Sequence, residues 1–485
     1  MSLSNQIGEP VEPLPFALYK TTMKCVDYQN DENKLGHLKR LRIPLWVALP
    51  IVGILLAVPL SLRFWNESAG LDNAYRYHFE KTSSGSVTSN LGKEINFYQE
   101  RISRNPNDGL DRASLAKTYL KMARATGDAN WYLLAEQTAK RSLLHLPFDN
   151  HGAILALARV AEARHDFAQA IDLAQQVLQN QPGNEDALSL LVTANLATGK
   201  VDQAKQAANT LVNQIPTIGS LTLRALVNQA QGKDEAALQD FQQALAAEEP
   251  GEAGSSAWVR TMLGRFYVQQ GNHKLADQLY REALRILPRY PLALVNLAEL
   301  ETRLGHYKAA ERYYSQVFVS PAYPNVFDHV ALQGLARVKE LQGDVSGAKE
   351  QRDKAETLLR QHLDVNSFGH RRELARLLLE SGQSQDVAEA LSLMQAEVRV
   401  RRDPETLDTL AWALSGSERW HEAQQVMREA LRWGIRDAGL FYRAGMIEQK
   451  LGNQSQAAAY FQLAQKTDPT FNEQPKRILE LFIRP

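Results

Sequence analysis

The feature that most constrains this chain is an alanine that recurs twelve residues before a proline. Successive alanines of this kind also recur at a period of about 34 residues, for example from Ala170 to Ala204. A fixed period of that length indicates a stack of similar two-helix units instead of one compact core. The alanine–proline spacing holds at five places: Ala135 with Pro147, Ala170 with Pro182, Ala204 with Pro216, Ala276 with Pro288, and Ala457 with Pro469.

One unit is written out most completely in Leu263–Pro288, LGRFYVQQGNHKLADQLYREALRILP. Gly264 and Ala276 are small residues that let two antiparallel helices approach closely. Gly271 suits the turn between the helices, because glycine readily takes a positive φ. Pro288 ends the second helix, since proline cannot donate a backbone hydrogen bond there.

These positions and the repeat period resemble the tetratricopeptide-repeat family over about three quarters of the chain. We expect an all-α solenoid of about ten helix pairs over residues 107–470, including degenerate units. The resemblance implies a right-handed solenoid whose concave face, lined by the first helices, binds peptides or protein segments. It does not imply which ones.

The repeat register also predicts which side chains line the concave face. The residue after the small first-helix position should project there, and others follow one turn later. Arginines among them could hold a carboxylate or a carbonyl through a planar fork of donors. The candidate partner-binding residues are Arg159, Thr193, Arg265, Glu299, Arg303, Arg337, Trp412 and Lys450.

A membrane anchor is predicted before the array. Ile43–Leu62 is twenty residues without a charge, which matches the thickness of a bilayer's hydrocarbon core at helical rise. We therefore assign residues 43–64 as one transmembrane helix. A buried core helix and a cleaved signal peptide are the alternatives, but the length disfavours the first and the long charged region ahead of it disfavours the second.

The flanking charges predict the orientation. Lys34, Lys39, Arg40 and Arg42 precede the span, whereas Arg63 is followed by acidic residues. By the positive-inside tendency, residues 1–42 form a cytoplasmic tail and the array is extracytoplasmic. We expect a single-pass protein of the bacterial inner membrane.

Two shorter segments flank the array. Residues 65–106 are predicted as a juxtamembrane linker that ends in an N-terminal capping helix. Its stretch SSGSVTSN predicts a loop through residue 93, and Glu94–Arg104 has apolar residues at helical spacing. Residues 471–485 are predicted as a C-terminal capping segment.

Composition and motifs exclude several classes of function. The 55 basic and 55 acidic residues balance, which argues against a nucleic-acid binder. Phosphate-loop, HExxH and GxSxG motifs are absent, and the single cysteine, Cys25, excludes a cysteine zinc site. The scattered His145, His165, His273 and His306 are interpreted as solvated or capping residues. We expect no enzyme activity, no metal and no cofactor.

Three functional hypotheses remain open. The first is a membrane-anchored scaffold whose extracytoplasmic array binds a partner protein in the assembly or organisation of a membrane complex. The second is a periplasmic holding chaperone for clients such as apocytochromes or secreted proteins. The third is an envelope polysaccharide-export factor.

Overall fold

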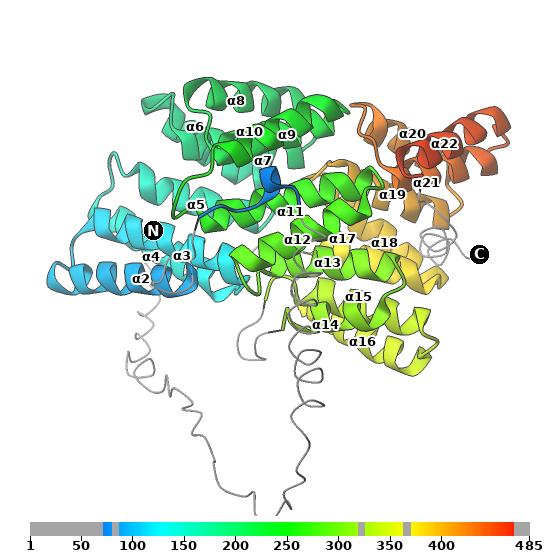
Figure 1. The fold of residues 1–485 in the computed structure, drawn as a ribbon, viewed down its shortest axis with the longest axis horizontal. Helices are drawn as coiled ribbons and strands as arrows, with labels where there is room; N and C mark the ends of the chain where they lie inside the picture. The colour runs from blue at the N-terminus through cyan, green and yellow to red at the C-terminus, as the bar shows by residue number, and fades with distance from the viewer. Residues whose placement is uncertain (1–70, 80–86, 319–324, 362–369, 470–485) are drawn as a thin grey trace, which may run out of the picture. The chain divides into compact units, whose positions relative to one another are not determined.

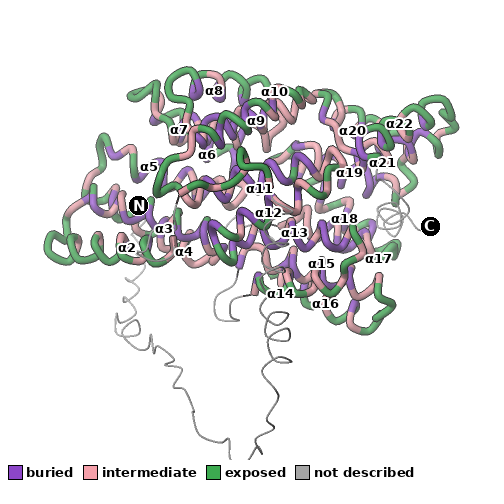
Figure 2. The backbone as a smooth tube through the Cα atoms, in the orientation of Figure 1, coloured by how far each residue is buried: buried purple, intermediate pink, exposed green. Residues whose placement is uncertain are grey.

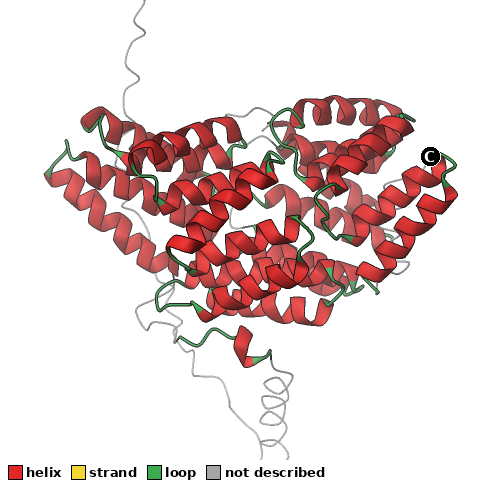
Figure 3. Cartoon of the chain, turned by 90° about the horizontal axis from the view of Figure 1, so that it is seen from above, coloured by secondary structure: helices red, strands yellow, loops and turns green. Residues whose placement is uncertain are grey.

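A computed structural model describes residues 71–79, 87–318, 325–361 and 370–469. Within these ranges the regular structure is helical, with 21 α-helices, one short 3-10 helix and no strand (Figures 1 and 3). None of the described helices is both long enough and apolar enough to cross a bilayer. The predicted span at 43–64, the tail at 1–42 and the C-terminal segment at 471–485 lie outside the described ranges.

Ten helix pairs follow one another, which confirms the predicted all-helical solenoid. They are numbered here from pair 1 to pair 10 in chain order. The pairs are α3 (Gly109–Thr126) with α4 (Asn130–His145), α5 (His151–Ala163) with α6 (Phe167–Asn180), α7 (Glu185–Ala197) with α8 (Val201–Gln214), α9 (Ile218–Ala230) with α10 (Asp234–Ala246), α11 (Ala253–Gln269) with α12 (His273–Ile286), α13 (Pro291–Arg303) with α14 (Tyr307–Ser315), α15 (Asp328–Leu341) with α16 (Val345–Gln361), α17 (Arg371–Ser381) with α18 (Ser384–Glu397), α19 (Pro404–Gly416) with α20 (Trp420–Leu431), and α21 (Ala438–Lys450) with α22 (Gln454–Thr467).

A further helix, α2 (Val87–Arg104), packs on α3 ahead of pair 1. The loop predicted through residue 93 is therefore wrong, because the helix begins seven residues before Glu94. Leu91 and Ile95 explain the early start, since they are four residues apart and both are buried.

The second-helix alanines are the common core of the array. Their exposed fraction is 3 % or less in every pair, so the small side chain sits where two helices meet. Figure 2 shows buried stretches in the inner parts of the helices and exposed stretches at the outer edges of the array. The Gly264 position is equally tight, because a methyl group there would lie 2.4 Å from the Tyr280 ring. The alanines are Ala135, Ala170, Ala204, Ala237, Ala276, Ala310, Ala348, Ala390, Ala423 and Ala457.

Each pair reverses direction through one residue with positive φ between its two helices, here called the inner turn. This conformation favours glycine, which has no Cβ to clash with the following carbonyl. Pair 2 uses His165 (φ 63°) and pair 9 uses Glu418 (φ 59°). The other inner turns carry Gly127, Gly199, Gly232, Gly271, Gly305, Gly343, Gly382 and Gly452.

The array turns back on itself, and the first five inner turns contact loops from much later in the chain. The pattern is regular: for pairs 1 to 5, the inner turn of pair n contacts the loop that follows pair n + 5. We call these the closure contacts and number them in order. They join Gly127 to Asn325, His165 to His370, Gly199 to Arg402, Gly232 to Gly434, and Gly271 to Asp468.

Backbone hydrogen bonds and close approach hold the closure contacts. In the first, the Val326 amide donates to the Gly127 carbonyl at 2.8 Å. In the third, the Arg402 amide donates to the Ala197 carbonyl, also at 2.8 Å. Because one partner in each bond is a loop of a distant pair, consecutive turns of the solenoid brace each other. Sequence reasoning did not predict this.

Candidate binding cavity

The first five pairs enclose a cavity of about 1220 Å³. Its walls come from the first helices α3, α5, α7 and α9, together with α2, α11 and the end of α12. The first helices line the cavity with one face, because their opposite faces pack against the second helices around the buried alanines. The predicted concave surface is therefore present in this half of the array.

Ion pairs between neighbouring helices arrange the charged part of the wall. Lys117 of α3 bonds Asp186 of α7 at 2.8 Å. Lys121 bonds Glu94 of α2 at 3.3 Å. Burial alone would raise the pKa of Asp186, but the hydrogen bond and charge of Lys117 outweigh it and hold the pKa below its usual value. These pairs fix wall side chains and leave little net charge.

Arg159 and Thr193, two predicted residues, lie in this wall. Arg159 forms an ion pair with Glu162 at 3.0 Å, and the Thr193 hydroxyl donates to the other oxygen of Glu162. Arg124 also lines the cavity and is exposed, and it forms no ion pair with a residue of the described ranges. Its guanidinium is the wall cation most available to an incoming carboxylate or carbonyl group.

The apolar part of the wall combines aliphatic side chains with four aromatic ones. Trp258 of α11 and Tyr290 contribute from one side. Tyr77 and Phe79 contribute from the segment 71–79, with their rings 5.5 Å apart in an edge-on arrangement. Such a lining suits a chain with apolar side chains and a polar backbone, because apolar area and scattered polar groups are both present.

Segment 71–79, here called the strap, is docked against α11 and α12. It contains the 3-10 helix η2 (Asn73–Tyr75). Arg260 is fully buried, and its guanidinium donates to the Tyr75 carbonyl at 2.8 Å and to Glu248 at 3.0 Å. The Tyr77 amide donates to Glu282 at 2.8 Å. The part of the linker that the structure describes is therefore held in place.

The remaining predicted residues lie in pairs 5 to 10, away from the cavity wall. Arg337 joins Glu299 at 3.1 Å. Burial would raise the pKa of Glu299, but Arg337 and the half-buried Arg303 hold it below its usual value. Trp412 is 5 % exposed and packs under the Arg443 guanidinium, so its ring is not offered to a partner. Lys450 lies over the Trp420 ring at 5.8 Å.

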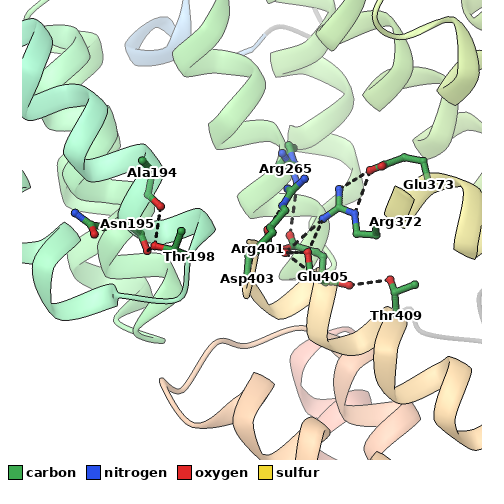
Figure 4. A network of polar contacts seen from close by, with 11 residues as sticks. Ala194, Asn195, Thr198, Arg265, Arg372, Glu373, Arg401, Asp403, Glu405 and Thr409 are labelled. Atoms are coloured by element: carbon green, nitrogen blue, oxygen red, sulfur yellow. Dashed lines mark hydrogen bonds and ion pairs between the residues drawn. The ribbon is translucent and has the colours of Figure 1, made fainter. Parts of the chain in front are cut away.

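Arg265 belongs to a polar network that Figure 4 shows from close by. Its guanidinium lies 3.9 Å from Glu405 of α19. Arg372 bridges Glu373 at 2.8 Å and Asp403 at 3.4 Å. Burial would raise the pKa of Asp403, but Arg401 and Arg372 lower it to about 2. These charges neutralise one another within the chain.

The histidines divide into two groups. His145 and His306 are exposed, as expected. His165 and His273 are not solvated: both lie at closure contacts, and the His273 side chain is 12 % exposed with its Nε2 3.8 Å from Asp468. The signal for His165 was its place at a position where glycine is the rule. Across the described ranges, no three histidine, cysteine or acidic side chains are grouped so as to hold a metal ion.

Comparison with known proteins adds sequence support for the repeats. Models described as tetratricopeptide repeat match residues 161–225, 217–289, 261–325 and 438–471. The chain is 25 % identical over 301 residues to the cellulose synthase operon protein C of Pseudomonas fluorescens (strain SBW25). That match covers 59 % of this chain and 23 % of the relative, so the chain spans about a quarter of the relative's length.

Solved structures resemble the chain at low sequence identity. The human IFIT1 dimer with PPP-AAAA is 15 % identical, covers 78 % of this chain and 85 % of that one, and has a TM-score of 0.43. A tetratricopeptide repeat protein from Parabacteroides merdae is 15 % identical, covers 59 % and 98 %, and has a TM-score of 0.36. From its helix pairs and the family matches together, the chain contains tetratricopeptide repeats in an all-helical solenoid.

Proposed function

We propose that this chain is a non-enzymatic, membrane-anchored scaffold whose cavity holds an extended segment of a partner protein. The observation that supports this proposal most directly is the cavity of about 1220 Å³ lined by the first helices of pairs 1 to 5. Repeat arrays bind partners on that surface, and the aromatic and ion-paired wall suits a polypeptide. The inner charges of the later pairs already bind one another, which favours the cavity over them.

Site-specific photo-crosslinking tests where the partner binds. A photoreactive residue replaces Thr193, which lines the cavity, in the full-length chain expressed in its own cells. The matched control places it at Lys205, which is exposed on the second helix of the same pair. We expect one crosslinked protein, in stoichiometric amount, from position 193 alone. Equal crosslinking from both positions, or from neither, would contradict the proposal.

The anchor and its orientation have a separate test. Cys25, the only cysteine, lies in the predicted cytoplasmic tail, and Lys349 is exposed on α16. With Lys349→Cys added, a membrane-impermeant maleimide should label position 349 in intact cells and Cys25 only after lysis. The reverse pattern would place the array in the cytoplasm, and release of the chain by alkaline carbonate would refute the anchor.

The relative's name favours a second candidate, an envelope polysaccharide-export factor, since it refers to a cellulose synthase operon. In that case the Tyr77, Phe79 and Trp258 rings would stack on sugar faces. Cello-oligosaccharides added to the full chain should then change tryptophan fluorescence, and Trp258→Phe should remove that change. No fluorescence change in the wild type would dismiss this candidate. Many weakly crosslinked unfolded proteins at position 193 would instead favour a holding chaperone.

A further inference from the structure

The second closure contact differs in chemistry from the other four. His165 occupies the positive-φ position that glycine fills at the four other closure turns. A side chain in the left-handed conformation costs about 1–2 kcal/mol relative to its ordinary conformation. The imidazole is therefore held at this contact against a local conformational preference.

Three imidazoles meet at this contact. The His165 ring stacks on Phe167 at 5.6 Å between centroids and meets the edge of His370 at 6.2 Å. The His370 ring lies 4.2 Å from that of His329, which is 5 % exposed. The Nδ1 atom of His165 is buried and has no hydrogen-bond partner among the described residues. An added proton at that nitrogen would also find no acceptor.

The charges that face the three rings come from two neighbouring elements. Arg372 and Glu373 belong to α17, and Arg401 lies in the loop before α19. Burial, then Arg401, lowers the pKa of His165 to about 3, and Glu373 opposes this only in part. Burial, then His370, lowers the pKa of His329 to about 3. The closed contact therefore holds the neutral rings of His165 and His329 next to the guanidinium groups of Arg372 and Arg401.

We propose that the second closure contact is a proton-operated gate: protonation of His165 separates the α5–α6 turn from His370 and opens the side of the cavity. The first, third and fourth closure contacts, whose paired residues include no histidine, stay closed at the same pH. The fifth also contains a histidine, His273, beside Asp468, and is therefore not used as a control. Arg159 and Glu162 of α5 line the cavity, and Glu162 is three residues before His165. Movement of this turn therefore alters the wall that contains them.

The direction of the pH effect follows from linkage. A base whose pKa is lower in the closed state than in the open state stabilises closure above its ordinary pKa of about 6.5. That stabilisation is lost as the pH falls from about 6.5 towards 3. With these values, protonation of His165 alone raises the equilibrium constant for opening of the contact about 30-fold between pH 7.5 and pH 5.

Hydrogen exchange followed by mass spectrometry tests the gate on the full chain at pH 7.5 and pH 5, after correction for intrinsic exchange rates. Protection of the inner turn around His165 should fall at least about 30-fold. The inner turns at Gly199 and Gly232 should change much less. In His165→Gly, which restores the residue of the neighbouring closure turns, the pH effect should shrink by about 30-fold. His306→Gln, at an exposed histidine outside the closure contacts, should behave as wild type.

Two results would overturn the gate. One is pH-independent protection at the second contact, and the other is an equal loss at all five contacts, which would mean general acid unfolding. If His165→Gly fails to fold, His165→Asn replaces it, because asparagine also tolerates positive φ. The pH-dependent opening of the contact does not depend on the proposed function. Only its consequence, access to a partner-binding cavity, rests on that function. A pH-dependent contact with no crosslinking at position 193 keeps the gate and refutes the binding cavity, and the reverse refutes the gate alone.

Discussion

Replacing Gly232 by alanine should break the fourth closure contact, whereas the same change at Gly343 should not. Both glycines have positive φ, 66° and 82°, and both lie at inner turns. A methyl group at position 232 would lie 2.0 Å from the carbonyl oxygen of Gly434. At position 343 nothing lies within 4 Å of it. The pair of variants therefore separates the cost of conformation from the cost of closure.

The magnitudes follow from these two terms. The left-handed conformation costs alanine about 1–2 kcal/mol, partly offset by about 0.4–1 kcal/mol from the stiffer unfolded chain. This net cost of about 1 kcal/mol applies to both variants. At position 232 the two backbones must also separate by about 1 Å, and overpacking of this kind costs about 1–3 kcal/mol more. We expect Gly232→Ala to be the less stable variant by that difference.

Urea denaturation followed by circular dichroism measures the difference. Because repeat arrays need not unfold in one step, hydrogen exchange at residues 231–234 gives a second, local measurement. Loss of protection there in Gly232→Ala, with normal protection around Gly343 in Gly343→Ala, is the expected pattern. Equal local protection, with stabilities that differ by less than about 0.5 kcal/mol, the usual scatter of surface substitutions, would refute the close approach.

Two further perturbations have expected results. Arg260→Met should lower the free energy of unfolding by about 3–5 kcal/mol, because it leaves the Glu248 carboxylate buried and unpaired. Proteases should then cleave the strap, and an uncut strap would contradict its docking by this residue. Burial raises the pKa of Asp328 to about 6 despite the bond from the Asn325 amide, so stability from this group is present below about pH 4 and is lost as the pH rises to 6. In denaturant titrations, Asp328→Asn should therefore raise the free energy of unfolding by about 1–3 kcal/mol at pH 7.5 and by almost nothing at pH 3.5. A lower free energy of unfolding at both pH values would contradict this.

Local patterns explain what the sequence could predict. The helix pairs, their buried alanines and the turn glycines follow from residues within one repeat unit, because each unit's contacts are mostly with itself and its neighbours. The loop predicted through residue 93 failed because serine and glycine dominate its composition. The apolar spacing of Leu91 and Ile95 was present in the sequence, but it outweighs that composition only when α3 covers it.

The closure contacts could not be predicted in the same way. Gly199 and Gly232 are already explained by a positive φ, so nothing in the sequence marks their second role against loops of pairs far along the chain. For the same reason the repeat register placed Arg159 and Arg337 on one continuous groove. The structure places Arg159 in the cavity wall and Arg337 among carboxylates of α13 and α17.

The constant offset of the closure contacts limits how this array can change in length. An open solenoid tolerates the loss or duplication of one unit, because each unit contacts only its neighbours. Here, excision of one pair from the middle would move every loop beyond it by one place. Gly127 would then face the loop of His370 instead of that of Asn325, and every other inner turn ahead of the excised pair would also meet the loop that belongs to the next closure contact. Such a chain gains or loses units at its ends far more readily than in its middle.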